Sequence, residues 1–391
     1  MTMPATAMSP RKFVILAALL SLAFLVAYNR QAFLGGAFGD NIGADLRSVW
    51  FAATLAWQGD APRAFDPLAF AAAYQAFSGM PITFPAFPYP PHTLLYYLPL
   101  AVLPFAAAFF VWVTVTFIAF AAVVCRRAAE PMFAALILLA SPAALTNLSG
   151  GQNGFFSGAL LCGGLLLLER RPYLAGIFFG LLTYKPQLGI VLPFALLAGG
   201  YYRSIGSAVV TAATVVLISL LLFGAESWLR FFTLSAPIQV QFLEEGVGTF
   251  TKMTPSSFMA GRMLGLPIAV DYALQAVAAG AAIAGTIWAV RRKAPLELKA
   301  AVAMVAALLA PPYVFTYDMC VVAAAQVLLA PMIASFSRAE RWIHAGVWLL
   351  PIAMIPFAQI SLPVAPILLG LLFWTLLRRV RAIAADESGR S

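Results

Sequence analysis

Asp45 is the first residue whose type and position could support chemistry. It follows Gly43-Ala44 in the first polar segment of a largely apolar chain, and a carboxylate at such a low-dielectric boundary could take a proton from a hydroxyl group. Asp is also among the best residues for capping a helix, and we expect a helix to begin at Leu46. The sequence supports the two roles equally.

Lys185 is the second candidate, because it is the sole lysine within a long apolar stretch. An ionisable group at membrane depth is costly, so a functional role with a charged partner is the default hypothesis, and a phosphate would be a suitable partner. A lysine whose ammonium group reaches the membrane interface is the alternative. The neighbouring Pro186 and Gln187 argue mildly against that alternative.

Gln152 and Asn153 lie in the glycine-rich turn formed by residues 149–154. Their amides can donate and accept hydrogen bonds, which suits sugar hydroxyls. Gly, Asn and Gln also serve simple turns, and the sequence favours neither interpretation over the other.

Two proline-containing segments carry further polar and aromatic candidates. The first, 85–92, cannot be helical, because prolines remove hydrogen-bond donors and favour extended backbone, and it contains Tyr89 and His92. The second, 311–318, presents Asp318 beside aromatic side chains that suit a sugar ring. Tyrosine and histidine are also ordinary residues of membrane interfaces, so His92 keeps that second interpretation.

The composition indicates that a membrane surrounds these residues. The chain has 391 residues, of which 62% are hydrophobic and 10% charged, whereas a soluble domain carries about 25% charge. Apolar runs recur at lengths close to the roughly 20 residues that cross a bilayer. The three cysteines lack CxxC spacing, so neither a disulfide framework nor a metal site is indicated.

The net charge of +9 does not indicate nucleic-acid binding, because the basic residues form short clusters between apolar runs instead of a stripe. Such clusters are typical of cytoplasmic loops, so we expect both termini in the cytoplasm. Most acidic residues then lie on the opposite side, where we expect any chemistry that uses carboxylates. The clusters are Arg11/Lys12, Arg126/Arg127, Arg170/Arg171, Arg203, Arg291/Arg292/Lys293, Arg338/Arg341 and Arg378/Arg379/Arg381.

The first outer segment, 30–91, follows an uncleaved first span at 11–29. Apolar residues at helical spacing predict two amphipathic helices at the membrane interface, one after Asp45 and one from Asp66-Pro67 to Gly79. Capping is the favoured role for Asp66, because proline follows it.

The segment 172–202 is enclosed by basic clusters that belong on the same side of the membrane. It is long enough for a hairpin of two short helices with Lys185-Pro186 at the tip, and a single tilted span is the competing interpretation. An interrupted helix is tolerated within a membrane only beside protein or a water-filled cavity, so the hairpin could form a wall of an active site.

These elements predict an all-α, polytopic membrane protein with about ten to twelve spans. One of these spans is expected at 131–148 and a second outer segment at 224–266. Residues 1–381 form one integral membrane domain, and 382–391 form a short cytoplasmic tail. Motifs for nucleotide binding or serine hydrolysis are not found, which disfavours cytosolic nucleotide chemistry.

Five sets of fragments occur in order along nearly the whole chain. They are Gly43–Leu46 with Trp57–Gly59, Tyr89–Pro91 with Pro99-Leu100, Gly151–Asn153, Arg171–Gly176 through Tyr184–Gln187, and Pro312-Tyr313 with Tyr317-Asp318. Together they resemble glycosyltransferase family 87, the bacterial polyprenol-phosphate-mannose-dependent mannosyltransferase type with the GT-C membrane fold. Many members have an aromatic residue where this chain has Leu46, so acceptor contacts beside Asp45 are expected to differ.

The resemblance implies an inverting transfer of a hexose, with mannose as the first expectation. The donor would be a polyprenyl-phosphate sugar, and the acceptor a glycan or glycolipid at the outer face of a bacterial cytoplasmic membrane. No cofactor is expected, and metal dependence is left open. Asp45 would be the general base and Lys185 the ligand of the donor phosphate. Sugar or acceptor contacts are expected from Tyr89, His92, Gln152, Asn153, Gln187, Tyr317 and Asp318.

A flippase for lipid-linked sugars or a secondary transporter is the rival class. Lys185 and Asp318 would then form an ion or proton relay, and the proline and glycine breaks would serve as hinges. The sequence has no inverted repeat to support a transporter. A noncatalytic, lipid-binding scaffold is a third alternative.

Overall fold

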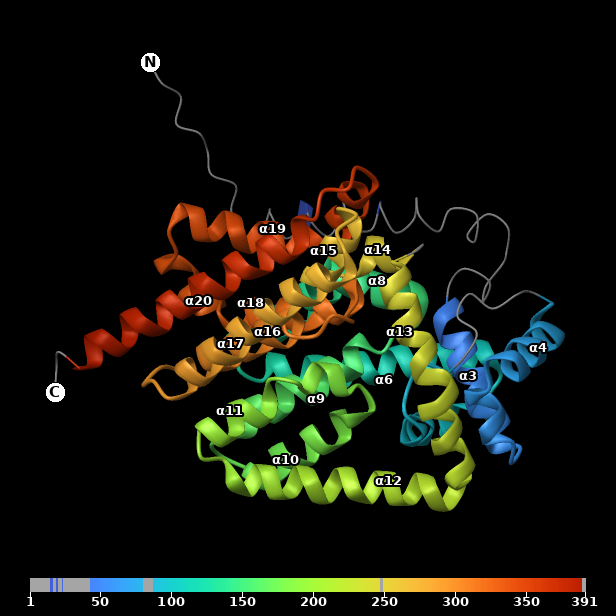
Figure 1. Ribbon diagram of the computed structural model, residues 1–391. Helices are drawn as coiled ribbons and strands as arrows, with labels where there is room; N and C mark the ends of the chain where they lie inside the picture. The colour runs from blue at the N-terminus through green and yellow to red at the C-terminus, as the bar shows by residue number, and fades with distance from the viewer. Residues whose placement is uncertain are drawn as a thin grey trace.

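The computed structural model describes residues 15, 16, 19, 23, 43–79, 87–246 and 249–388. Nearly all of the predicted first span at 11–29 therefore lies outside the described residues, as does Asp40. The described part is built from helices and contains no strand, which confirms the all-α prediction. Its longer α-helices, shown in Figure 1, are α3 (Ala44–Trp57), α4 (Pro67–Ser78), α6 (Phe105–Cys125), α7 (Pro131–Leu139), α8 (Pro142–Gly150), α9 (Gly154–Leu167), α10 (Pro172–Leu181), α12 (Tyr202–Arg230), α13 (Ala236–Glu245), α16 (Ile268–Val290), α17 (Leu296–Leu309), α18 (Cys320–Leu328), α19 (Arg338–Gln359) and α20 (Val364–Ser388).

Shorter elements connect these helices. The short α-helices are α5 (Leu94–Tyr97), α11 (Leu192–Ala198), α14 (Thr249–Met253) and α15 (Ser257–Met263). The 3-10 helices are η1 (Ala61–Phe65), η2 (Pro91–Thr93), η3 (Leu98–Leu100), η4 (Leu182–Tyr184), η5 (Pro186–Gly189), η7 (Thr316–Met319) and η8 (Ala330–Ser335), and η6 (Phe231–Ser235) is a π-helix.

Within the described residues, four helical segments are long and apolar enough to cross a membrane, which confirms a multi-pass membrane protein. They are α6, α16, α19 and the segment Tyr202–Glu245. This last segment runs from α12 into α13 and is kinked at Gly224, which has a φ of 75°. The other apolar segments form shorter or broken helices. The span predicted at 131–148 is one of these, because α7 and α8 meet at 62° where Ser141 caps α8 and Pro142 begins it.

The two helices of the segment predicted to lie on the outer side form where the sequence predicted them, and Figure 1 places both at the end of the molecule opposite the C-terminus. Asp66 caps α4 by accepting a 3.0 Å hydrogen bond from Ala69 N, and Gly79 ends the helix with a φ of 73°. These details confirm the predicted cap. The interfacial location of α3 and α4 stays a prediction, in keeping with exposed apolar side chains such as Leu68.

The segment 172–202 forms a hairpin. Its two arms are α10 with η4 and η5 with α11, and the chain breaks between them at Lys185. Ser204 Oγ donates a 2.8 Å hydrogen bond to Pro172 O, so the chain returns to the end from which it started. Gly176 and Gly180 allow the first arm to lie directly on α12, as Figure 1 shows, because a Cβ at either position would collide with α12.

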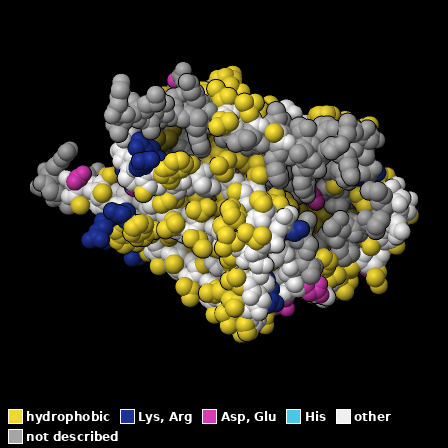
Figure 2. All heavy atoms as spheres, turned by 90° about the horizontal axis from the view of Figure 1, so that it is seen from above, with side chains coloured by type: hydrophobic (Ala, Val, Ile, Leu, Met, Phe, Trp, Pro, Cys, Tyr) yellow, Lys and Arg dark blue, Asp and Glu magenta, His cyan; other side chains and the backbone are white. Residues whose placement is uncertain are grey.

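The interior is formed chiefly by α9, α17 and α18, whose small and branched side chains are almost all buried. Figure 2 shows apolar side chains spread over the middle of the viewed face, with several Lys and Arg side chains gathered towards the end where α20 finishes. The helix α20 continues to Ser388, so most of the predicted tail at 382–391 is helical.

Candidate active site

The turn after α8 is the centre of the candidate site. Gly151 ends α8 with a φ of 66°, a left-handed conformation that favours glycine. The start of α3 docks on the same turn, because Gly43 N donates a 2.7 Å hydrogen bond to Ser149 O. A Cβ on Gly151 would lie 2.7 Å from Leu46 Cβ, so this close approach depends on glycine.

Asp45 lies in the first turn of α3 and does not cap it. The N-cap position belongs to Gly43, which has a φ of 79°, and no side chain bonds the helix start. The Asp45 Oδ2 atom instead accepts a 2.5 Å hydrogen bond from Gln152 Nε2. The capping interpretation of Asp45 was therefore wrong, and its carboxylate is directed towards the glycine-rich turn.

The surroundings of Asp45 make it more basic than an ordinary aspartate. Solvent reaches the side chain, yet the protein around it disfavours the charged form, and this desolvation raises the pKa of the Asp45 carboxyl. The hydrogen bond from Gln152 acts in the opposite direction. A carboxylate with a raised pKa suits general base catalysis.

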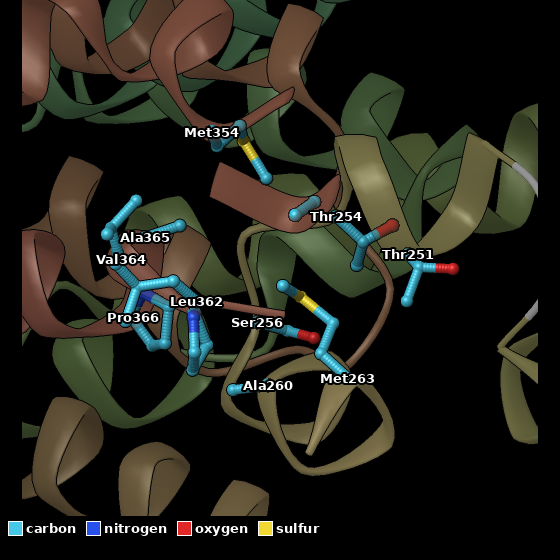
Figure 3. A pocket seen from close by; sticks show the side chains of 12 residues that line it. Thr251, Thr254, Ser256, Ala260, Met263, Met354, Leu362, Val364, Ala365 and Pro366 are labelled. Atoms are coloured by element: carbon cyan, nitrogen blue, oxygen red, sulfur yellow. The ribbon is translucent and has the colours of Figure 1, made fainter. Parts of the chain in front are cut away.

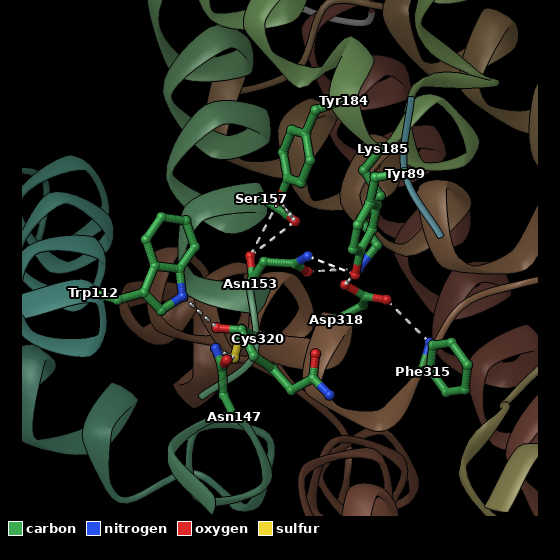
Figure 4. Close-up of polar contacts among 11 residues, drawn as sticks. Tyr89, Trp112, Asn147, Asn153, Ser157, Tyr184, Lys185, Phe315, Asp318 and Cys320 are labelled. Carbon is green, nitrogen blue, oxygen red and sulfur yellow. Dashed lines mark hydrogen bonds and ion pairs between the residues drawn. The ribbon is translucent and has the colours of Figure 1, made fainter. Parts of the chain in front are cut away.

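Lys185 does not extend to an interface; it is 1% exposed and bound on several sides, as Figure 4 shows. Its Nζ lies 2.5 Å from Asp318 Oδ1, donates a 3.0 Å hydrogen bond to Asn153 Oδ1, and lies 4.7 Å from the centre of the Tyr317 ring. The charged partner expected for Lys185 is thus Asp318 within the described part of the protein. Asn153 Nδ2 also donates a 2.8 Å hydrogen bond to Tyr89 Oη, which brings that residue into the network.

Asp318 is fully buried at the second chain break, in η7. Its Oδ2 atom accepts a 3.1 Å hydrogen bond from Phe315 N, so both oxygens of the carboxylate are engaged. The Phe315 and Tyr317 rings stack at 5.3 Å and form an aromatic wall beside the pair. Gly154 lies against this break, because a Cβ there would collide with Tyr317 O.

His92 and Gln187 are not part of this network. His92 is buried, stacks on Trp228 at 5.7 Å, and has its Nε2 atom 3.4 Å from Thr183 Oγ1. Burial lowers the pKa of His92 to about 4, so its ring is neutral near pH 7. Gln187 is half-buried in η5 and forms no side-chain hydrogen bond with other described residues.

Four supporting residues were not predicted as site residues. Trp112 Nε1 donates a 3.2 Å hydrogen bond to Gln152 O, and Gln152 N donates a 2.9 Å bond to Asn147 O. The Tyr184 and Ser157 hydroxyls share a 2.6 Å hydrogen bond, and Ser157 Oγ donates to Asn153 O at 3.0 Å. Tyr184 belongs to the Tyr184–Gln187 fragment of the family resemblance, which was the available signal for it. The other three lie in apolar runs, where nothing in their spacing separates them from ordinary packing residues.

A hollow elsewhere in the protein lies between α14–α15 and the facing ends of α19 and α20. Figure 3 shows a mainly apolar lining, with Met263 and Met354 reaching into it. It has no carboxylate or basic residue in its lining, so it does not replace the Asp45 region as the candidate site. Among the described residues, no group of three His, Cys, Asp or Glu side chains is placed to hold a metal ion.

The glycosyltransferase family 87 model matches residues 87–312 of the chain. This range includes the Gln152–Asn153 turn and the whole hairpin, while Asp45 precedes it and Asp318 follows it. Neither the curated proteins nor the solved structures include a match.

Proposed function

We propose that this chain, which belongs to glycosyltransferase family 87 and is therefore a membrane glycosyltransferase, transfers a hexose from a polyprenyl-phosphate donor. Mannose is the first candidate for the hexose. The proposed acceptor is a hydroxyl of a glycan or glycolipid at the extracytoplasmic face of a bacterial cytoplasmic membrane. Asp45 carries the mechanistic proposal, because its carboxylate is accessible, has a raised pKa and is fixed by Gln152 beside an interior polar network.

The proposed reaction is a single displacement with inversion. The acceptor hydroxyl oxygen attacks the anomeric carbon from the face opposite the phosphate, and its proton passes to Asp45. The bond between the anomeric carbon and the phosphate oxygen breaks, and the electron pair leaves with the polyprenyl phosphate. The carboxylate raises the nucleophilicity of the acceptor, and its fixed orientation lowers the entropic cost of attack.

Lys185 is proposed to stabilise the phosphate that leaves. Its ammonium is bound to Asp318 and Asn153, so binding a phosphate there requires an exchange of at least one of these contacts. Contacts to the sugar or acceptor are proposed for Tyr89, Asn153, Tyr317 and Asp318, which surround Lys185, and for His92 and Gln187. Gln152, the remaining expected contact, is bound to Asp45 instead. The buried pair is also what a proton relay would need, so the transporter alternative is tested together with transfer.

The proposal is tested with the full-length protein in liposomes that contain radiolabelled polyprenyl-phosphate mannose and membrane-extracted acceptors. Transfer of label to the acceptor fraction, absent with a nucleotide sugar as donor, supports the proposal. Parallel assays with polyprenyl-phosphate glucose and with a chelator address the sugar and metal dependence. Movement of the labelled lipid between leaflets without transfer would favour a flippase and contradict the proposed reaction.

A further inference from the structure

Two residues of one turn contact the same oxygen of Asp45. Gln152 Nε2 donates to Asp45 Oδ2 at 2.5 Å, and a Cβ on Gly150 would lie 2.6 Å from that oxygen. Gly150 therefore leaves the space that the carboxylate occupies, and Gln152 fills the remaining side with a donor. A glutamine bound in this way has one of its two amide N–H donors committed to the carboxylate, so its orientation is set by Asp45.

The turn that carries Gln152 is fixed at several points. Its backbone oxygen accepts from Trp112 Nε1, and its backbone nitrogen donates to Asn147 O. The next residue, Asn153, is held by Lys185 at 3.0 Å. The turn thus connects the buried Lys185–Asp318 pair to Asp45 through two successive side chains.

We propose that Gln152 is a positioning residue for Asp45 rather than a ligand of the sugar, with Gly150 providing the space for the carboxylate. The hydrogen bond to Oδ2 fixes the plane of the carboxylate and leaves proton acceptance to Oδ1. This inference rests on the proposed function only in taking Asp45 as the general base; the contact itself does not depend on which sugar or acceptor is used.

Among the described elements packed against α3, few other charged groups face Asp45. Tyr89 and Tyr317 lie close enough to experience its charge, and burial keeps the pKa of Tyr89 well above its usual range, so that phenol stays neutral. The remaining titratable groups on α3 and on the elements packed against it (η1, η3, α5, α6 and α8) are Arg47, Arg63, Tyr96, Tyr97 and Cys125. Gln152 is the residue whose hydrogen bond to the carboxylate favours its charged form.

Two substitutions separate positioning from sugar binding. Gln152→Glu preserves size but places a second carboxylate against Asp45, so the two share a proton and the titration midpoint of Asp45 rises by about one pH unit or more. Gln152→Leu removes the donor, which also raises the midpoint and lowers kcat by about a hundredfold with KM for donor and acceptor near normal. Gln58→Glu is the matched control, because it makes the same change at the exposed far end of α3.

The measurement is a pH titration of the full-length protein followed by infrared difference spectroscopy of the protonated carboxyl. The Asp45 band is the one missing from Asp45→Asn, and the apparent Tm of each variant checks folding. A raised midpoint in both Gln152 variants, with no change in Gln58→Glu, is the expected result. An unchanged midpoint, with the loss confined to KM, would make Gln152 a sugar ligand and overturn the inference. Because this readout needs no turnover, a raised midpoint in a protein that transfers no sugar would refute the proposed function alone.

Discussion

Lys185 Nζ lies 2.5 Å from Asp318 Oδ1, although 133 positions separate the two residues in the sequence. Each residue stands at a break in an apolar segment, Lys185 between η4 and η5 and Asp318 in η7. The ammonium and the carboxylate are almost completely buried, so each depends on the other for charge compensation. This pair holds the two breaks together on one side of the turn that carries Gln152 and Asn153.

Removing one member of this pair should destabilise the protein more than removing both. We expect Lys185→Met and Asp318→Asn each to lower the stability by about 3–5 kcal/mol, because each leaves an uncompensated buried charge or a changed protonation state. The double variant should regain most of that loss, and the amide oxygen of the introduced asparagine keeps an acceptor for Phe315 N. Thermal unfolding of the detergent-purified proteins measures the three variants against the wild type.

The same double variant separates the two roles of Lys185. If Lys185 only holds the network together, the double variant retains donor affinity in an equilibrium binding assay. If Lys185 binds the donor phosphate, the double variant loses more affinity than Asp318→Asn alone, although its stability recovers. A double variant no more stable than either single variant would contradict the compensation between the two charges.

Gly154 should be intolerant of a side chain. Gly154→Ala would drive a Cβ into Tyr317 O, and this backbone cannot rotate away as a flexible side chain could. We expect a loss of about 1–3 kcal/mol, seen as a lower apparent Tm, together with reduced transfer, because α9 and η7 must separate. Gly206→Ala is the control, since that helical glycine has nothing near its Cβ position and should be unchanged or slightly more stable. Equal Tm values for the two variants would argue against this close packing.

His92 should make stability depend on pH. Burial lowers the pKa of His92 to about 4, whereas an unfolded histidine titrates near 6.5. Below pH 6.5 His92 is therefore protonated in the unfolded chain, whereas in the folded protein it stays neutral until about pH 4. The free energy of unfolding falls between these pH values by up to about 3 kcal/mol. His92→Phe keeps a ring to stack on Trp228, so its apparent Tm should fall less between pH 7 and pH 4.5 than that of the wild type. Parallel decreases in the two proteins would show that His92 is not the group responsible.

Asp45 should set the acidic limit of sugar transfer. The reaction needs the ionised carboxylate, and desolvation raises the pKa of Asp45, so transfer should be lost as the pH falls through a value above that of an ordinary aspartate. The pH profile of kcat measures this limit. A profile that stays flat down to pH 4 would contradict a raised pKa for the group that limits the reaction.

The sequence predicted those features of the fold that depend on neighbouring residues. Asp66-Pro67 and Gly79 mark the ends of α4 through local capping and backbone preferences, and the structure has the helix there. The hairpin tip at Lys185-Pro186 was also predictable, because basic clusters on both sides restrict where the chain can turn. The span expected at 131–148 was harder to judge, since apolar composition alone does not show whether Pro142 begins a new helix.

The candidate site was harder to predict than the fold, because it is formed by contacts between residues that are distant in the sequence. Lys185 and Asp318 were paired only in the transporter alternative, because no local pattern selects Asp318 among the acidic residues that could have been the partner of Lys185. The role of Asp45 turned on whether its helix begins at Ala44 or Leu46, a small difference that the docking of Gly43 on Ser149 decides. The turn at 149–154 was predicted from its glycines, but its contact with Asp45 requires the folded arrangement of α3 and α8.

Sugar transfer by Asp45→Asn, measured beside Asp60→Asn in the same liposome assay, tests directly whether Asp45 is the general base. Asparagine preserves the size of the side chain but cannot take up the acceptor proton, whereas Asp60 is an exposed residue beyond the end of α3. If Asp45 is the general base, Asp45→Asn keeps its apparent Tm and donor binding while kcat falls by about a hundredfold or more, and Asp60→Asn behaves like the wild type. Near-normal turnover in Asp45→Asn would contradict the assignment of Asp45 as the general base.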